Sequence, residues 1–480
     1  MSDKQKQHPP QPAQPYKYYS SSSIGSIDLS ELDATISIAE EQRQDAFNTS
    51  AKIKVLITKT RRLLEQEEAE DDSTTKNKQS DIQRELESLI EKTLPSEKKA
   101  VRIANLSFQF QEYARLKSFQ YFLSSNGKLL PPSQLPPSIS DEEYLAGAVI
   151  GLTQDLARYV VGRATARDAQ SVMIARDLAN GCLEYLMKFD FRNGMLRRKY
   201  DGVKYALKTC ETVLYELSVT GIDIDDNING VTDGAEPDSK RMKLDHQNGS
   251  HSKHDIMPKE ELEQLRSRME YRDELREKLI KRCRDAQKAA KQAIFALHRN
   301  DYKRATKLIN DCETVIQNDL NPMVDEDPSL HYGSYANVLE EYAEAKLFHT
   351  WLMDKPQGQL LHPNGFTKIS LEPAEYLGGL CDLTGEVGRY AVQRGTKRDS
   401  KGVQFCLETN LSILFALETL QRFPSGSYIN KKMDQLRRSV EKLERMLYEL
   451  SLVQATGRQI VADSVNEQEK ACDGGTDDAK

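Results

Sequence analysis

Apolar residues recur at spacings of three and four along most of the chain, which is the period of a helix that buries one face. The stretch from 338 to 352 shows this pattern clearly. Its apolar positions follow steps of four, three, three and four: Val338, Tyr342, Ala345, Phe348 and Leu352. Alternating patterns typical of strands are scarce. The pattern therefore predicts an all-α protein.

Two polar stretches interrupt the helical pattern. Residues 1–28 are rich in Pro, Gln and Ser, and residues 222–256 contain few large apolar side chains. Such segments bury too little apolar surface to fold, so we expect a disordered N-terminal tail and a flexible linker. Residues 459–480 are expected to form an acidic tail. The remaining chain forms two expected helical domains, 29–221 and 257–458.

The two expected domains repeat each other. Residues 111–114 match 340–343, residues 143–145 match 375–377, and residues 214–218 match 447–451. The offsets are 229, 232 and 233 residues, so order and spacing are retained. This regularity indicates a duplicated or fused domain, with a period far too long for a solenoid. We expect two tandem bundles of about six or seven helices each.

The overall charge limits the classes of partner. The chain has 480 residues, with 67 Lys and Arg against 74 Asp and Glu and a net charge of -7. Contact with nucleic acid would therefore need a local basic patch. The seven cysteines form no CxxC pair, which favours reduced intracellular thiols and argues against zinc. No run reaches the roughly 18 apolar residues of a membrane span, so no membrane partner is expected.

A short basic cluster lies within the expected linker. It comprises Lys240, Arg241 and Lys243 in an otherwise acidic, polar segment. Such a cluster fits an importin-type nuclear signal, and it fits a solvated charge run equally well. We expect the protein in the cytoplasm and, through this signal, in the nucleus.

Two pairs of acidic residues in the second half have helical spacing. Glu341 and Glu344 are three residues apart, and Asp382 and Glu386 are four apart, so each pair projects from one helix face. Facing helices would bring four carboxylates together, and a divalent cation would remove their mutual repulsion. Oxygen ligands alone favour Mg²⁺ or Mn²⁺. The alternative is that both pairs lie on solvated helix faces.

The residues around Asp382 favour an inward carboxylate. Residues 378–385 form an apolar run of small side chains, in which a charged residue is more often buried than solvated. Glycine destabilises a helix, so its presence here indicates close packing or close approach of a ligand.

Several motifs resemble the translin family. Residues 196–221 are similar to the last long helix of translin. Residues 294–299, 337–352 and 373–390 are similar to translin-associated factor X, a member of the same family. The chain thus resembles a natural fusion of a translin-like half, about 45–221, and a factor X-like half, about 257–458.

The resemblance implies a fold, partners and an activity. It implies a hollow, octamer-like helical shell that binds single-stranded RNA and DNA, with the factor X subunit acting as a magnesium-dependent endoribonuclease. It assigns the catalytic and metal-binding roles to Glu341, Glu344, Asp382 and Glu386. Because fusion fixes the two halves at one to one, about four copies of this chain would form a closed homo-oligomeric shell.

The first half lacks the corresponding acidic set. The repeat pairs Glu112 with Glu341, Arg115 with Glu344, residues 150–151 with Asp382, and Asp155 with Glu386. Two carboxylates with an arginine between them cannot form the same site, so no catalysis is expected in this half.

The interval between matched residues also differs between the halves. The stretch from Tyr144 to Asp155 is one residue longer than that from Tyr376 to Glu386. An inserted residue in a helix is often accommodated as a π-bulge, so we expect one in the first half.

Nucleic-acid contacts are less clearly marked in the sequence. Candidate phosphate contacts are Arg115, Lys117, Arg158 and Arg389, and ordinary ion pairs are an equally good interpretation of each. Tyr113 fits either base stacking or the core. His349 follows the acidic helix but fits a packed or solvated histidine better than a catalytic one.

The hypothesis from the sequence is a metal-dependent endoribonuclease acting on single-stranded RNA. Catalysis is expected in the second half, and RNA binding and shell assembly in the first. The alternative is a non-catalytic single-stranded nucleic-acid-binding protein or a helical scaffold.

Overall fold

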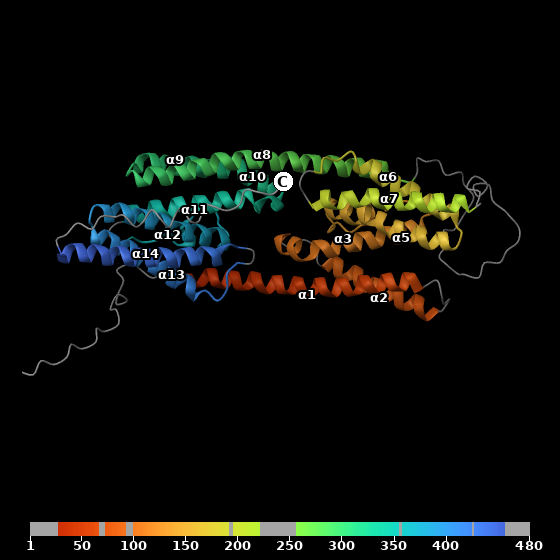
Figure 1. Ribbon diagram of the computed structural model, residues 1–480, viewed down its shortest axis with the longest axis horizontal. Helices are drawn as coiled ribbons and strands as arrows, with labels where there is room; N and C mark the ends of the chain where they lie inside the picture. Colours follow the sequence, from red (N-terminus) through yellow and green to blue (C-terminus); the bar gives the residue numbers. More distant parts are fainter. Residues whose placement is uncertain are drawn as a thin grey trace, which may run out of the picture. The chain divides into compact units, whose positions relative to one another are not determined.

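The computed structural model describes residues 27–66, 73–92, 99–191, 195–220, 256–354, 358–424 and 427–456. Within these ranges every regular element is helical, which confirms the expected all-α class (Figure 1). No helix among them is long and apolar enough to cross a membrane. The basic cluster at Lys240, Arg241 and Lys243 and the expected acidic tail lie outside the described residues.

The first half folds into six helical rods. Its elements are α1 (Ser30–Gln66), α2 (Ser73–Lys92), α3 (Lys99–Ser124), the continuous rod α4 (Asp141–Tyr144), η3 (Leu145–Gly151) and α5 (Leu152–Thr165), then α6 (Ala169–Leu186) and α7 (Met195–Val219). Ser140 begins the rod as an N-cap, because it and Glu143 form a capping box.

The second half repeats this arrangement. Its elements are α8 (Lys259–His298), the rod α9 (Tyr302–Val315), η5 (Ile316–Leu320) and α10 (Asn321–Glu326), then α11 (Ser334–Met353), α12 (Pro373–Thr396), α13 (Ser400–Thr419) and α14 (Ile429–Thr456). The described chain therefore carries six rods in each half, as the repeat predicted.

The contacts divide the chain into two compact units. The N-terminal unit contains Glu40–Lys278 and Asp327–Ser329, and the C-terminal unit contains the described residues up to Ala39, Leu279–Glu326 and those from Leu330 onward. This division differs from the domain limits expected from the sequence, 29–221 and 257–458. The difference arises because α1 and α8 are each long enough to contribute to both units.

The first part of α8 belongs to the core of the N-terminal unit. Leu262 and Leu265 are buried in that core. The Tyr185 hydroxyl donates a 2.7 Å hydrogen bond to the Leu262 carbonyl, and Arg268 pairs with Asp141 at 2.6 Å. Apolar burial and polar contacts thus fix this part of α8 on the translin-like helices.

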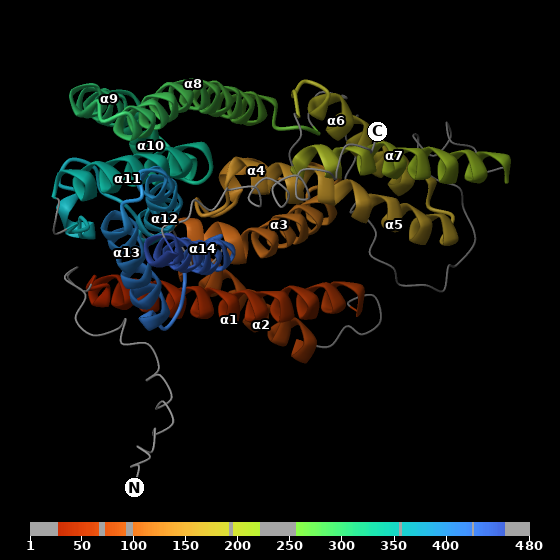
Figure 2. The ribbon, with the colours of Figure 1, turned by 60° about the vertical axis from the view of Figure 1, so that its left-hand side comes forward.

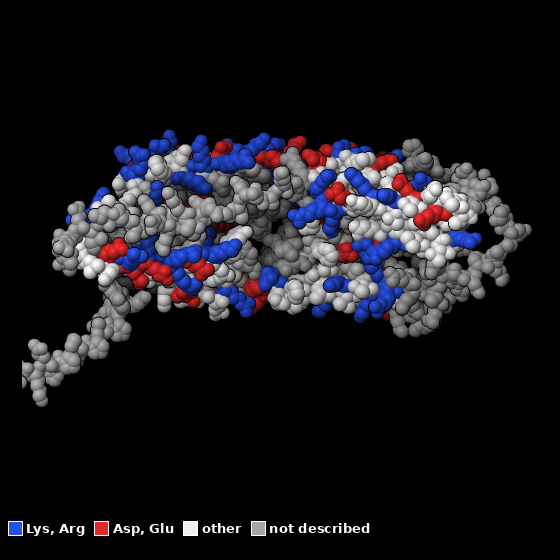
Figure 3. Space-filling view, viewed as in Figure 1, with Lys and Arg blue, Asp and Glu red and all other residues white. Residues whose placement is uncertain are grey.

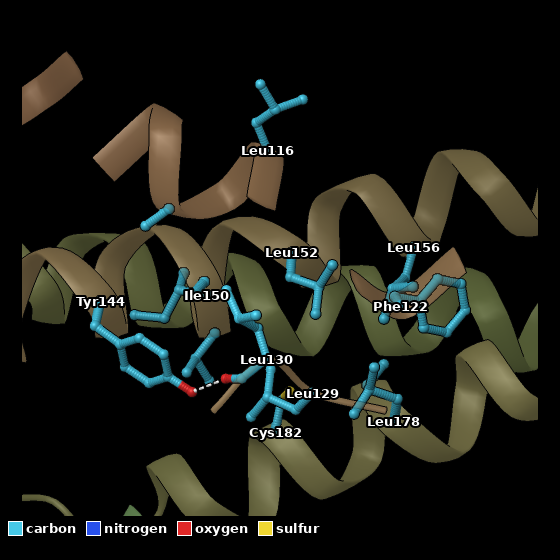
Figure 4. Close-up of a cluster of buried hydrophobic side chains, with 14 of the residues drawn as sticks. Leu116, Phe122, Leu129, Leu130, Tyr144, Ile150, Leu152, Leu156, Leu178 and Cys182 are labelled. Carbon is cyan, nitrogen blue, oxygen red and sulfur yellow. Dashed lines mark hydrogen bonds between the residues drawn. The ribbon is translucent and has the colours of Figure 1, made fainter. Parts of the chain in front are cut away.

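The expected π-bulge is present in the first half. Leu145–Gly151 is a π-helical segment, whereas α12 continues as an α-helix through the matching region. The widened turn accommodates the additional residue between Tyr144 and Asp155. Figure 4 shows the core around this segment, with the Tyr144 hydroxyl donating to the Leu130 carbonyl at 2.7 Å.

Glycines let paired helices cross closely in both halves. A Cβ atom at Gly379 of α12 would lie 2.7 Å from the Ala343 Cβ and 2.9 Å from the Glu340 carbonyl oxygen, both on α11. Gly147 occupies the matching place in the first half, where a Cβ would overlap the Gln111 carbonyl. Close packing therefore accounts for Gly379 in the small-residue run of α12, which is one of the two interpretations that the sequence offered. Figure 2 shows α11 and α12 side by side in the C-terminal unit.

This crossing predicts opposite effects of two alanine substitutions in α12. Gly379→Ala should destabilise the protein by about 1–3 kcal/mol, because the new methyl group meets the α11 backbone. Gly385→Ala is the matched control, since a Cβ there meets nothing within 4 Å. It should be neutral or stabilise by up to about 1 kcal/mol. Urea unfolding measures both, and equal effects would contradict the close crossing.

Candidate metal centre

Two closely packed helices position the acidic residues of the C-terminal unit. Helix α11 carries Glu341 and Glu344, and α12 carries Asp382 and Glu386. Glu372 begins α12 through a capping box with Glu375, with proline in the first turn as the sequence predicted. The glycine crossing then holds α11 and α12 close together.

The central carboxyl group is that of Glu344, which is only 8% exposed. Burial, together with the smaller effects of the charges of Asp382, Glu341 and Glu386, raises the pKa of Glu344 to about 8. All four predicted residues therefore act on one region. Within the described chain, Glu344 has no hydrogen bond or ion pair. A buried acid without a partner is costly when ionised, and a bound cation would offset that cost.

An ammonium group from α14 reaches the same region. The Lys432 Nζ donates to Asp382 Oδ2 at 2.5 Å and also contacts Glu340. Burial lowers the pKa of Lys432, but its hydrogen bonds to Asp382 and Glu340 outweigh burial and raise it. Burial also raises the pKa of Glu340. Neither Lys432 nor Glu340 was identified as a site residue from the sequence.

Two further basic side chains contact the outer carboxylates. Lys291 of α8 lies 3.0 Å from Glu341. His298, also on α8 and buried, contacts Glu386 through Nε2, and its Nδ1 lies 3.5 Å from Gln393 Nε2. Neither Lys291 nor His298 was identified from the sequence, because the contacts of both depend on where α8 packs.

The four carboxylates share a region without forming a tight ligand cage. In the described part of the chain, His331, Glu372 and Glu375 form the group of three whose ligand atoms lie within 4.8 Å of one another. That group belongs to the start of α12, where Glu375 Oε2 accepts from the Glu372 backbone. Three of the predicted carboxylates, those of Asp382, Glu341 and Glu386, instead contact basic side chains from different parts of the unit.

In the N-terminal unit a guanidinium group lies beside the carboxylates that correspond to the acidic pairs of the second half. Arg115 donates two hydrogen bonds to Asp155, at 2.7 and 2.6 Å. Arg61 lies 3.4 Å from Glu112 and 3.6 Å from Asp155. The two carboxylates that remain in this half are therefore already neutralised by arginine, so no cation is needed to balance them.

The sequence candidates for phosphate contact mostly form internal ion pairs. Arg115 and Arg158 both contact Asp155, and Lys117 lies 2.5 Å from Glu87. Arg389 is 54% exposed and 3.8 Å from Glu386. The ion-pair interpretation therefore describes Arg115 and Lys117, while Arg158 and Arg389 remain accessible from solvent.

The structure also places Tyr113, the candidate for base stacking, and His349, which the sequence favoured as a packed or solvated histidine. Tyr113 is 1% exposed and belongs to the core of the N-terminal unit, so it is not available to stack on a base. His349 Nε2 lies 3.0 Å from the Thr306 hydroxyl, outside the acidic group.

The fold and the site together describe a duplicated helical-bundle protein, in which one of the two halves carries a group of acidic residues. The chain belongs to the translin family, which it matches over residues 42–221 and again over 274–454. The two matches confirm the tandem arrangement inferred from the internal repeat.

Individual relatives match parts of the chain. The translin-associated protein X homolog of Schizosaccharomyces pombe is 26% identical over 198 residues, which cover 38% of this chain and 84% of that protein. Translin of Gallus gallus is 36% identical over 81 residues, or 17% of this chain, and translin of Homo sapiens 35% over 80 residues. Each of these translin matches spans only 35% of the translin concerned.

Two solved structures also match part of the chain. One, described as a complex of AfC3PO with duplex RNA, is 21% identical with a TM-score of 0.37, covering 41% of this chain and 98% of that chain. A crystal structure of AfC3PO is 24% identical with a TM-score of 0.35, covering 40% and 98% of the two chains.

The raised pKa of Glu344 predicts a pH-dependent effect of Glu344→Gln. In metal-free protein the folded state keeps this carboxyl protonated between pH 4.5 and about 8, where the unfolded chain is ionised. Wild-type stability therefore falls as pH rises through that window. Glu344→Gln avoids this loss, so it should be more stable than wild type by about 2–4 kcal/mol above pH 8 and nearly equal to it at pH 4.5.

Urea unfolding in EDTA at pH 4.5 and 8.5 measures this difference. Glu444→Gln, at an exposed position on α14, is the control and should show no pH-dependent difference from wild type. A Glu344→Gln difference that is the same at both pH values would show that Glu344 is not a buried, uncompensated acid.

Proposed function

We propose that this chain is a metal-dependent endoribonuclease that cleaves single-stranded RNA in its factor X-like half. The observation that carries the proposal is the buried Glu344 carboxyl, which lacks a partner and is surrounded by Asp382, Glu341 and Glu386. Membership of the translin family supports the choice of RNA as substrate.

The residues fit a hard divalent cation. Glu341, Glu344 and Asp382 offer carboxylate oxygens from two helices, which suits Mg²⁺ or Mn²⁺ better than softer metals. When bound, such a cation would withdraw charge from the scissile phosphate and lower the pKa of an attacking water.

The chain's own side chains would orient the reaction. His298 contacts one carboxylate oxygen of Glu386. The other oxygen of Glu386 would complete the ligand set or orient a water. Lys432 holds Asp382 and would add positive charge to a site that binds a phosphate there. The translin-like half, whose corresponding carboxylates are paired with arginine and whose Arg158 is exposed, would hold RNA and build the shell.

A second candidate function is single-stranded nucleic-acid binding without cleavage. The contact of Lys432 with both Asp382 and Glu340 favours it, because an ammonium group already balances part of the acidic charge. This alternative predicts RNA binding that is unchanged by Mg²⁺ and no cleavage.

Substitution of the acidic residues separates the two functions. With Mg²⁺ and a labelled single-stranded RNA, Asp382→Ala and Glu344→Ala should each reduce cleavage about 10²-fold or more, since each removes a metal ligand. Glu112→Ala is the matched control, because Glu112 occupies the place of Glu341 in the arginine-paired half. It should leave the rate of cleavage within about threefold of wild type.

Cleavage that persists in both second-half variants would contradict the assignment of Asp382 and Glu344 as metal ligands. Absence of metal-dependent cleavage in the wild type, with RNA binding retained, would favour the second candidate.

Assembly into a closed shell of about four copies is part of the same proposal, since each chain contributes two bundles. The mass of the protein in solution tests it, with a tetramer expected and a clean monomer as the contradictory result.

A further inference from the structure

A strongly positive surface lies on α8 and α9 of the C-terminal unit. Between residues 281 and 307 there are nine Lys or Arg residues and two Asp residues, in a chain whose net charge is -7. Figure 3 shows the basic side chains gathered over these helices, at the upper left. A surface this unbalanced attracts polyanions even on an acidic protein.

Part of this surface forms one face of α8. Its members follow steps of four, three, four and four residues, and all are exposed: Arg284, Lys288, Lys291, Phe295 and Arg299. We call this set the basic face. The opposite side of the same helix is buried through Cys283, Ala290 and Leu297, so packing fixes which side chains face outward. Gln287 and Gln292 line a shallow depression together with four members of the basic face, all except Arg299.

The cations of the basic face mostly lack acidic partners. Elsewhere on α8, Arg266, Arg276 and Arg282 each pair with a carboxylate three or four residues away. Among the described residues, Arg284, Lys288 and Arg299 have no carboxylate within 4.0 Å. Their mutual repulsion is therefore uncompensated, and a chain of phosphates would relieve it.

An aromatic ring lies within the basic face. Phe295 is 53% exposed, and the Arg299 guanidinium carbon lies 5.5 Å from its ring centroid. Exposed rings between cations are typical of surfaces that bind single strands, because unpaired bases stack on the ring while cations contact the backbone.

The basic face also adjoins the candidate metal centre. Lys291 Nζ lies 3.0 Å from Glu341, so one member of the face contacts a proposed metal ligand. From Arg284 to Arg299 the helix rises about 22 Å, which is long enough for several nucleotides. A strand lying along this face would thus lead toward the carboxylates.

We propose that the basic face of α8 binds single-stranded RNA, with phosphates on Arg284, Lys288 and Arg299 and a base stacked on Phe295. The choice of RNA rests on the proposed function. A second copy of this chain is the other occupant to consider, but two such faces would repel each other through their like charges.

Binding of a labelled 12-nucleotide oligouridylate in EDTA tests the proposal without cleavage. Arg284→Gln combined with Lys288→Gln should weaken binding about tenfold at 0.1 M salt and reduce the slope of log K against log salt by about 1.4, as expected for two lost phosphate contacts. Phe295→Ala should weaken binding about fivefold or more and leave the slope unchanged.

The matched control is Arg438→Gln combined with Lys442→Gln on α14. These residues have the same types, the same spacing and exposed positions in the same unit. The control should bind RNA like the wild type, and thermal unfolding should show all variants folded.

Two outcomes would overturn the proposal. In the first, the α8 pair binds RNA like the wild type, or no more weakly than the α14 pair. In the second, the α8 substitutions leave binding intact but change the mass of the assembly, which would make this face an interface between copies. Because the assay contains no metal, a failure here is distinct from a failure of cleavage.

Discussion

The close crossing of α11 and α12 is the constraint on which the site depends. Gly379 allows the two backbones to approach, and that approach places Glu344 near Asp382. The same crossing occurs at Gly147 in the first half, where Ile150 and Gly151 occupy the place that corresponds to Asp382. The shared packing therefore provides the framework, and the few side chains placed on it determine what each half can do chemically.

The two halves balance acidic charge in different ways. In the N-terminal unit, Arg115 fills the space beside Asp155 and makes a closed ion pair. In the C-terminal unit, Glu344 replaces that arginine and leaves an acid without a partner. Both halves carry a lysine at this place: Lys432, which contacts Asp382, in the second half and Lys199, which contacts Gln111, in the first. This lysine therefore belongs to the shared framework rather than to metal binding alone.

Periodicity and the internal repeat predicted the helical class, the tandem arrangement and the π-bulge, because each depends on local spacing. The sequence also placed the two acidic pairs on their helices. It missed Lys432, His298 and Lys291, since these approach the carboxylates only through the packing of α14 and α8. The extents of the compact units differed from expectation for a similar reason: α1 and α8 continue across both. The basic stretch at 281–307 is visible in the sequence, but which of its side chains are exposed depends on how α8 packs.

The central claim is that one half of the chain holds a divalent cation and the other half does not. Titration of metal-free protein with Mn²⁺, followed by electron paramagnetic resonance of the free ion, tests this claim most directly. We expect saturable Mn²⁺ binding in the wild type and in Glu112→Ala, and loss of Mn²⁺ binding when Glu344→Ala and Asp382→Ala are combined. Binding that survives this double substitution, or a wild type that binds no Mn²⁺, would contradict the account.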